Sequence, residues 1–268
     1  MKIRIVNAVI LLALAAIPAL ADQGQVMKWT IDGVQRQAVV FAPSVEPPNE
    51  KHPVVFAFHG HGGDMQKTAD KWGFQTVWPE AVVVYPQGLN GRGVVNDPAG
   101  NSPGWQIWPG HNNDRDVKFF DRMLETMRQK FAIDNNRVYA VGFSNGAYFC
   151  YVLWAERRTT LAAMGNVAGA QWSQPPTPTV LTGPLPVMQI AGIKDPEVTL
   201  AWQAEAIEVD QKINNAPMKQ GEPCGDSCVL FASSSQTPVR FFVHNGGHEY
   251  LSWMTAEFVT FFKNHTRS

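Results

Sequence analysis

The chain has 268 residues, a formal charge of −1 and 45% hydrophobic residues, so it can form one large domain with a substantial core. This hydrophobic content excludes an intrinsically disordered chain, and its 22 glycines and 19 prolines predict many ordered loops. Because the sequence has no basic stripe and no run of like charges, we expect no nucleic acid partner.

The first 21 residues predict a secretory signal peptide. A basic start precedes an apolar stretch at 9–20, which is shorter than the roughly 20 residues that a membrane span needs. Ala19-Leu20-Ala21 is a small-x-small cleavage pattern. We expect cleavage to leave 22–268 as a single catalytic domain, secreted or periplasmic and without a stable membrane span. An uncleaved anchor is the alternative.

Predicted strands and helices alternate along the rest of the chain. Strands are expected at 26–31, 34–41, 53–58, 82–85, 138–141, 161–167, 187–191 and 239–244, the first two joined by a hairpin turn at Asp32-Gly33. Helices are expected at 65–72, 116–131, 147–158 and 251–263, and a long loop at 86–115. This order predicts a three-layer α/β sandwich with a mostly parallel central sheet, whose catalytic groups gather at the carboxyl ends of the strands.

Gly142-Phe143-Ser144-Asn145-Gly146 is the most informative motif. It follows an apolar strand and precedes a helix without internal glycine or proline. The Gly-x-Ser-x-Gly pattern in this context is typical of a nucleophile elbow, because its glycines allow a strand to turn abruptly into a helix. We predict that Ser144 is a catalytic nucleophile.

A serine nucleophile needs a base, and imidazole suits this role near neutral pH. His248 follows a Gly-rich turn just after the last predicted strand, a position from which it can reach the serine. His244 lies within that strand, where a structural role is expected, and His265 lies in the tail. We therefore predict His248 as the base, with His244 as the alternative.

The acid is expected in a loop between the serine and the histidine. Asp195 stands in the turn after the strand at 187–191, where its carboxylate can accept the Nδ1–H of His248 and fix the tautomer. Asp226 and Asp210 are weaker alternatives.

A developing oxyanion needs two backbone donors. The N–H of Asn145, next to the nucleophile, is one candidate. The other is the N–H of His61 in the loop His59-Gly60-His61-Gly62-Gly63, whose glycines let amides point inward. Under this interpretation the side chain of His61 is free to vary.

Three cysteines complete the chemically informative residues. Cys224 and Cys228 flank three polar residues, and in an exported protein they predict a short disulfide, with metal binding as the alternative. Cys150 is expected to be a buried, inert thiol. Trp105 and Trp172 are candidates for substrate binding, with core packing as an equally weighted alternative.

Several motifs taken together resemble the polyhydroxybutyrate depolymerase and feruloyl esterase family of α/β-hydrolases. The matching motifs are His59-Gly60-His61-Gly62, Tyr85-Pro86-Gln87-Gly88, Gly104-Trp105, Asp116-Val117, 138–147, Gly192-Ile193-Lys194-Asp195 and Gly246-Gly247-His248. The resemblance extends over roughly 35–263 and implies that Ser144, Asp195 and His248 are the nucleophile, the acid and the base. The chain departs from the family at His61, where many relatives have Cys, at Ala191 and at Glu249-Tyr250.

The expected function is a carboxylic ester hydrolase that forms an acyl-enzyme and uses neither metal nor organic cofactor. Feruloyl or acetyl polysaccharide esters and polyhydroxyalkanoate-type polyesters are the expected substrates. A serine peptidase on the same fold and a non-catalytic carbohydrate- or polymer-binding protein are the alternatives. A metal-dependent hydrolase built on His59, His61, Asp64, His111 and Asp114 fits the spacing poorly. The sequence leaves the oligomeric state open.

Overall fold

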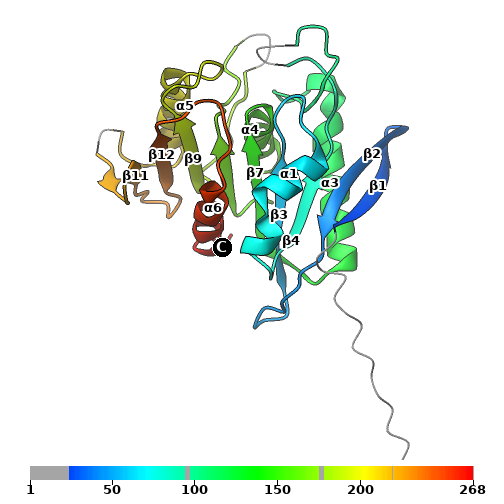
Figure 1. Cartoon of the computed structure of the whole chain (residues 1–268). Helices are drawn as coiled ribbons and strands as arrows, with labels where there is room; N and C mark the ends of the chain where they lie inside the picture. Colours follow the sequence, from blue (N-terminus) through cyan, green and yellow to red (C-terminus); the bar gives the residue numbers. More distant parts are fainter. Residues whose placement is uncertain (1–23, 94–96, 175–177, 219, 268) are drawn as a thin grey trace, which may run out of the picture.

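The computed structural model describes residues 24–93, 97–174, 178–218 and 220–267, so the predicted signal peptide lies outside the described residues. Its centre is a ten-stranded sheet with the order β1-β2-β4-β3-β7-β8-β9-β12-β11-β10 (Figure 1). The strands are β1 (Gln25–Ile31), β2 (Val34–Phe41), β3 (His52–Phe58), β4 (Val82–Pro86), β7 (Ile133–Phe143), β8 (Ala163–Val167), β9 (Val187–Gly192), β10 (Glu222–Pro223), β11 (Cys228–Phe231) and β12 (Val239–His244).

The middle of this sheet is parallel and both edges are antiparallel. Neighbouring strands from β4 to β12 in the sheet order pair in parallel, whereas β1, β2, β11 and β10 are joined by antiparallel pairing. The hairpin expected at Asp32-Gly33 joins β1 to β2, with Ile31 opposite Val34. Both turn residues have positive φ, 48° and 80°, as a two-residue type I′ turn requires.

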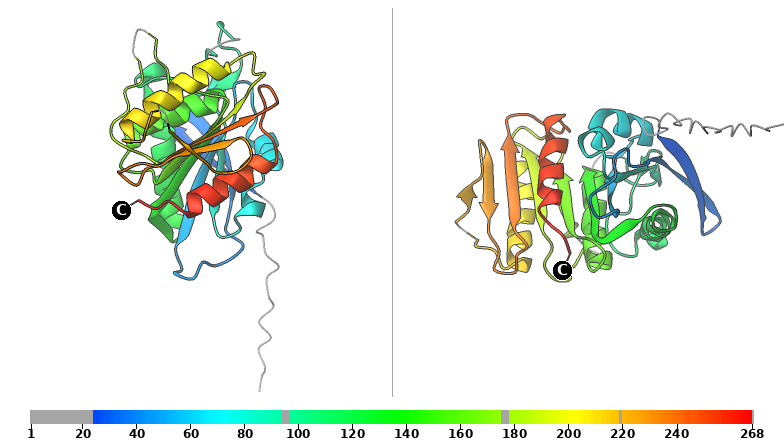
Figure 2. Two further views of the ribbon diagram at one scale, coloured as in Figure 1. Left: turned by 90° about the vertical axis from the view of Figure 1, so that its left-hand side faces the viewer. Right: turned by 90° about the horizontal axis from the view of Figure 1, so that it is seen from below.

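Helices cover both faces of the sheet (Figures 1 and 2). One face carries α1 (Met65–Trp72), α2 (Phe74–Val77) and α6 (Trp253–Lys263), and the other carries α3 (Arg115–Lys130), α4 (Asn145–Arg157) and α5 (Leu200–Ile213). Alternate side chains of β3 enter the two cores, with Phe56 and Phe58 on the α4 side and Val55 on the α1 side. Burying each Phe contributes about 1.5–3 kcal/mol. The predicted three-layer α/β sandwich is confirmed.

Some elements were not predicted from the sequence. The longest of them is α5, which begins after Thr199, whose hydroxyl accepts a hydrogen bond from the N–H of Trp202. Its buried side chains include Gln203, Asp210 and Gln211, so the apolar period that marks a helix is interrupted. The predicted loop at 86–115 also contains a short ribbon of β5 (Leu89–Asn90) with β6 (Pro103–Gly104) and a 3₁₀ helix at His111–Asp114.

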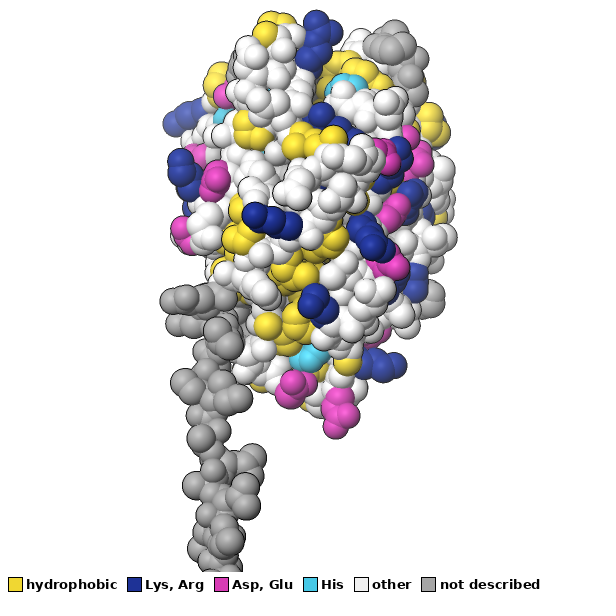
Figure 3. Space-filling model, turned by 90° about the vertical axis from the view of Figure 1, so that its right-hand side faces the viewer, with side chains coloured by type: hydrophobic (Ala, Val, Ile, Leu, Met, Phe, Trp, Pro, Cys, Tyr) yellow, Lys and Arg dark blue, Asp and Glu magenta, His cyan; other side chains and the backbone are white. Residues whose placement is uncertain are grey.

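The cysteines and the surface bear on the expected location and partners. Cys224 and Cys228 form a disulfide across the turn between β10 and β11, and Cys150 is free and buried. Over the described ranges, every helix is too short or too polar to cross a bilayer. On the face that Figure 3 presents, side chains of both charges are interspersed.

A buried carboxyl group lies on α5, on the face of the sheet that also carries α4. Asp210 is fully buried, and its Oδ2 accepts a hydrogen bond of 2.9 Å from the Tyr151 hydroxyl of α4. Its Oδ1 is buried without a partner among the described residues. Burial raises the pKa of Asp210 from 3.8 to about 8. Between these two values the folded protein holds a proton that the unfolded chain has released, so stability falls as pH rises.

Replacing Asp210 by Asn should remove this pH dependence, because the amide resembles the protonated acid and can still accept from Tyr151. We expect the melting temperature of Asp210→Asn to exceed that of the wild type at pH 8, with a gap that narrows toward pH 4. Asp226→Asn, in an exposed turn, is the control. Thermal unfolding of the three proteins between pH 4 and pH 8 measures these melting temperatures. A constant difference between Asp210→Asn and the wild type would refute the raised pKa of Asp210.

Candidate active site

The turn after β7 holds Ser144 in a rare backbone conformation. Its φ and ψ are 53° and −119°, a strained combination for a residue with a side chain. The N–H of Ser144 donates to the carbonyl of Val167, and its own carbonyl accepts from Ala147 and Tyr148 in the first turn of α4. The chain therefore passes from strand to helix in one residue and presents the serine at the carboxyl edge of the sheet.

The two glycines of the motif are required by close packing of the backbone. A Cβ on Gly142 would lie 2.2 Å from the carbonyl oxygen of Gly146. A Cβ on Gly146 would lie 2.1 Å from the carbonyl oxygen of Phe58 in β3. The elbow thus sits directly on the neighbouring strand, and any side chain at Gly146 must displace backbone atoms.

Asp195 and His248 meet at the same edge of the sheet. Asp195 Oδ2 lies 2.9 Å from His248 Nδ1. The other carboxylate oxygen accepts from the N–H groups of Glu197 and Val198, at 2.8 and 2.9 Å. Asp195 is 5% exposed, so a buried, fully hydrogen-bonded carboxylate holds the imidazole.

Backbone contacts lock the loops that carry these two residues. The N–H of Lys194 donates to the carbonyl of Gly246 at 2.9 Å, and that of Ile193 donates to the carbonyl of His244. Gly192 allows this approach, since a Cβ there would lie 2.3 Å from the carbonyl oxygen of Gly247. The relative position of Asp195 and His248 is therefore set by main-chain atoms.

The serine and the histidine are brought to one side of the molecule. The ring of Phe143, which precedes Ser144, lies with its centroid 4.8 Å from that of His248. His248 Nε2 lies 3.9 Å from Glu197 Oε2, beyond hydrogen-bond distance. Within the described residues the Ser144 hydroxyl makes no hydrogen bond. Serine–imidazole contacts are often long before substrate binds.

The alternative acids and base have other partners or positions. His244 accepts a hydrogen bond from the N–H of Gly246, and Asp210 binds Tyr151 in the core. Asp226 lies in the exposed turn enclosed by the disulfide. The structure thus pairs Asp195 with His248 and leaves the alternatives elsewhere.

The loop after β3 is fixed by the buried imidazole of His59. Its Nδ1 lies 2.7 Å from the carbonyl oxygen of Gly60, and its Nε2 accepts from the N–H of Gly88 at 3.0 Å. Burial lowers the pKa of His59 to about 4, so the ring is neutral near pH 7 and donates from Nδ1. The Gly60 carbonyl belongs to the peptide unit whose N–H is that of His61. His59 and the N–H of Gly63, which donates to the same carbonyl at 3.0 Å, together set the direction of this N–H, because the peptide is planar.

Neither proposed oxyanion donor is used inside the protein. In the part of the chain that is described, no protein atom accepts a hydrogen bond from the N–H of His61 or of Asn145. The expectation that the His61 side chain is free to vary is wrong. Its Nε2 lies 3.0 Å from Asp97 Oδ2, and its ring packs so closely on Gly104 that a Cβ there would lie 2.6 Å from Nδ1.

Trp105 is a packing residue, which corrects its expected role as a substrate contact. Only 2% of it is exposed, and its ring packs against Phe58 and Phe149. Its indole N–H donates to the carbonyl of His59 at 2.8 Å. The Asn145 side chain holds the main chain of Trp105, accepting from its N–H at 2.7 Å and donating to its carbonyl at 3.2 Å. The contribution of Asn145 and Trp105 to bracing the loop was missed in the sequence.

Trp172 belongs to a separate aromatic cluster beside the elbow. Its ring lies 5.3 Å from that of Trp108, and its indole N–H has no partner among the described residues. Tyr148, one helical turn after Ser144, packs in the same cluster, and its buried hydroxyl is also unpartnered in this part of the structure. A separate cleft of about 320 Å³ is lined by His248, the His59–Gly63 loop and Tyr250.

The residues proposed for a metal site do not assemble. Among the described residues, no three His, Cys, Asp or Glu side chains converge in a geometry that could hold a metal ion. His61 instead binds Asp97, and Asp64 caps α1 by accepting from the N–H groups of Gln66 and Lys67.

Comparisons with known proteins identify relatives of this chain that agree with the geometry of the site. No protein-family model matches the chain. The chain is 28% identical over 191 residues to feruloyl esterase D of Neurospora crassa, covering 61% of this chain and 60% of that protein. It is 25% identical over 231 residues to feruloyl esterase C of Emericella nidulans, covering 80% of this chain and 76% of that protein.

Among solved structures, an acetyl xylan esterase from Aspergillus awamori superposes with a TM-score of 0.69 and 14% identity, covering 90% of this chain and all of that one. The fold is that of an α/β-hydrolase, as the sequence predicted, and the chain is similar to feruloyl esterases, which are carboxylic ester hydrolases. The chain spans 60% of the length of feruloyl esterase D of Neurospora crassa.

The close packing of the elbow predicts that a side chain at Gly146 destabilises the fold. Gly146→Ala should lower the free energy of unfolding by about 2 kcal/mol or more, because the new Cβ meets main-chain atoms of β3 that cannot move aside. Gly247→Ala is the matched control, since its Cβ would lie no closer than 3.5 Å to a neighbour. Urea unfolding of both variants measures the difference. Equal stability of the two would contradict the packing described for the elbow.

Proposed function

We propose that the chain is a secreted serine esterase in which Ser144, His248 and Asp195 form a catalytic triad. The observation that carries this proposal is the 2.9 Å contact of His248 Nδ1 with the buried Asp195, at the sheet edge where Ser144 occupies a strained turn. Asp195 keeps the proton on Nδ1, which leaves Nε2 as the basic nitrogen. The similarity to feruloyl esterases supports the same class of reaction.

In the proposed mechanism the Ser144 hydroxyl attacks the ester carbonyl carbon while His248 Nε2 takes its proton. The carbonyl electron pair moves to oxygen, which accepts hydrogen bonds from the N–H groups of His61 and Asn145. The pair returns as the C–O bond to the alcohol breaks, and His248 gives its proton to the leaving oxygen. Water, deprotonated by His248, then attacks the acyl-enzyme, and His248 returns that proton to Ser144 Oγ as the bond from Oγ to the acyl carbon breaks and the acid is released.

The aromatic cluster beside the elbow is the proposed site for the acyl group. Two members of this cluster connect it to the nucleophile and the acid. Tyr148 is on the helix that begins after Ser144, and the N–H of Val198 donates to Asp195. The partly exposed ring of Trp172 offers an aromatic surface on which a phenolic acid can stack, whereas Tyr148 is buried and supports the cluster from α4. We therefore propose feruloyl esters of polysaccharides as substrates ahead of acetyl esters and hydroxybutyrate polymers.

The proposed setting is outside the cytoplasm. The chain would be exported by a signal peptide at residues 1–21, and residues 22–268 would act as a single catalytic domain. The Cys224–Cys228 disulfide supports an oxidising compartment.

Ser144→Ala should abolish ester hydrolysis, with a loss in kcat of at least about 10⁴-fold, and leave the melting temperature within a few degrees of the wild type. Ser252→Ala, at an exposed serine whose side chain caps nothing, is the control. Initial rates with methyl ferulate, 4-nitrophenyl acetate and polyhydroxybutyrate measure both the loss and the preference among acyl groups. Turnover retained by Ser144→Ala would require another nucleophile. Cleavage of casein but of none of the three esters would favour a peptidase.

His59→Phe tests the oxyanion loop, because it keeps a ring in the core but cannot hold the Gly60 carbonyl. We expect kcat to fall by about 10–10²-fold with little change in KM, since only charge that develops in the transition state loses its donor. His52→Phe, at the opposite end of β3, removes a comparably buried imidazole bonded to the Glu80 carbonyl. Stability should fall in both variants, and kcat only in the first. An equal kcat in the two would rule out this role for His59.

A further inference from the structure

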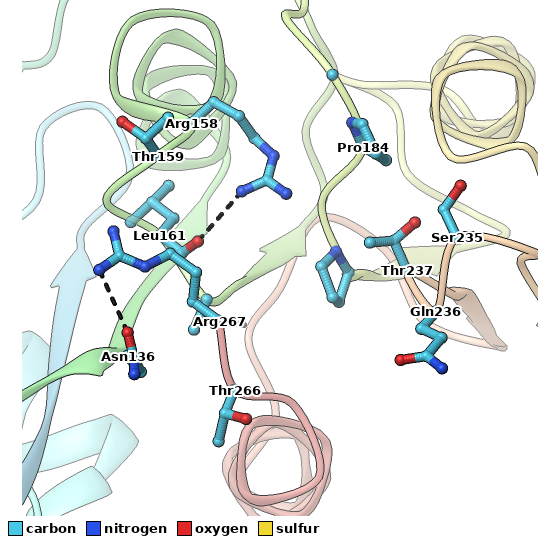
Figure 4. Close-up of a pocket in the computed structure, with 13 residues that line it drawn as sticks. Asn136, Arg158, Thr159, Leu161, Pro184, Ser235, Gln236, Thr237, Thr266 and Arg267 are labelled. Atoms are coloured by element: carbon cyan, nitrogen blue, oxygen red, sulfur yellow. Dashed lines mark hydrogen bonds between the residues drawn. The ribbon is translucent and has the colours of Figure 1, made fainter.

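A second pocket lies at the amino-terminal edge of the parallel strands, opposite the edge that carries Ser144. Its volume is about 620 Å³. Its walls come from the segments that precede β8, β9 and β12 and from the residues after α6 (Figure 4). Nothing in the proposed esterase reaction uses this edge.

The charge in this pocket is of one sign. Among the described residues, the lining includes Arg158 and Arg267 but no aspartate or glutamate. Within the described residues neither arginine forms an ion pair. Arg158 Nη1 donates weakly to the Leu161 carbonyl at 3.5 Å, and Arg267 Nη2 donates to Asn136 Oδ1 at 3.3 Å. The adjacent Arg157, by contrast, forms two hydrogen bonds of 2.8 and 2.7 Å to Asp121.

Arg158 is also incompletely hydrogen-bonded. Its Nε is buried and has no acceptor among the described residues. Burial, followed by the positive charge of Arg267, lowers the pKa of Arg158. A half-buried guanidinium beside a like charge is stabilised by an anion that contacts both charges. In Figure 4 this guanidinium points into the open space that faces Pro184, Ser235 and Thr237.

The remaining lining chemistry selects among anions. Hydroxyl and amide side chains supply the polar wall, chiefly Thr159, Ser235, Gln236, Thr237 and Thr266. The lining residues that the structure describes include no aromatic ring, so they offer no surface on which a base or a phenolic ring could stack. Arginine forks match the paired oxygens of carboxylates and phosphates.

We propose that this pocket binds an oxyanion, with Arg158 as its principal ligand, Arg267 as the second charge and the hydroxyl wall holding the rest of the molecule. Arg267 is fixed for this role because its main-chain N–H donates to the carbonyl of Asn136, near the start of β7, at 2.9 Å. The oxyanion can be free phosphate or the carboxylate of an acidic sugar, since both present the same oxygens to a guanidinium. The site is independent of ester hydrolysis.

Isothermal titration calorimetry at constant ionic strength tests the proposal, with inorganic phosphate, sodium glucuronate and neutral glucose as probes. We expect saturable binding of at least one anion and none of glucose. Arg158→Gln should weaken that binding at least 10-fold, and Arg267→Gln should weaken it less. The control is Arg122→Gln, which removes an exposed arginine paired with Glu125 on α3 and should bind like the wild type. Binding of phosphate alone would identify the oxyanion as phosphate, and binding of glucuronate alone would identify it as the carboxylate of an acidic sugar.

Two measurements keep this test separate from folding and from catalysis. In chloride buffer Arg158→Gln should melt no lower than the wild type, because it loses an uncompensated charge, and its ester hydrolysis should be unchanged. Absence of saturable binding by both anions, or equal binding by Arg158→Gln and Arg122→Gln, would overturn the proposal whatever the outcome for the esterase.

Discussion

The close contact between the elbow and β3 is the constraint on which the candidate site depends. Ser144 keeps a strained conformation with positive φ because Gly142 and Gly146 meet backbone to backbone and Gly146 rests on the carbonyl of Phe58. The same contact fixes where α4 begins and hence the direction of the N–H of Asn145. A strained residue persists only where its surroundings leave it no alternative, and here the surroundings are main-chain atoms of two neighbouring strands.

From this contact a continuous set of hydrogen bonds extends to the other proposed oxyanion donor. The Asn145 side chain holds Trp105, the Trp105 indole holds the carbonyl of His59, and the His59 ring holds the carbonyl of Gly60. Two loops that are far apart in the sequence are thereby placed in one rigid unit. Polar groups buried and satisfied in this way are costly to rearrange, so the two N–H groups are oriented before any substrate arrives.

Much of this arrangement could be predicted from local sequence, because its signals are local. The Gly-x-Ser-x-Gly motif, the alternating elements and the order of Ser144, Asp195 and His248 each depend on short spacings. The pairing of His61 with Asp97, the burial of Trp105 and the helix α5 with its buried polar side chains could not be predicted in this way. Each results from contacts between distant segments, and polar residues that are buried in pairs resemble surface residues when the sequence is read alone.

The most direct measurement is a crystal structure of the protein after reaction with diethyl 4-nitrophenyl phosphate, which leaves a covalent analogue of the tetrahedral intermediate. We predict a bond from phosphorus to Ser144 Oγ, with the phosphoryl oxygen about 2.7–3.1 Å from the N–H groups of His61 and Asn145 and with His248 Nε2 beside the ester oxygen. Attachment to another residue, or a phosphoryl oxygen directed away from both N–H groups, would contradict the account.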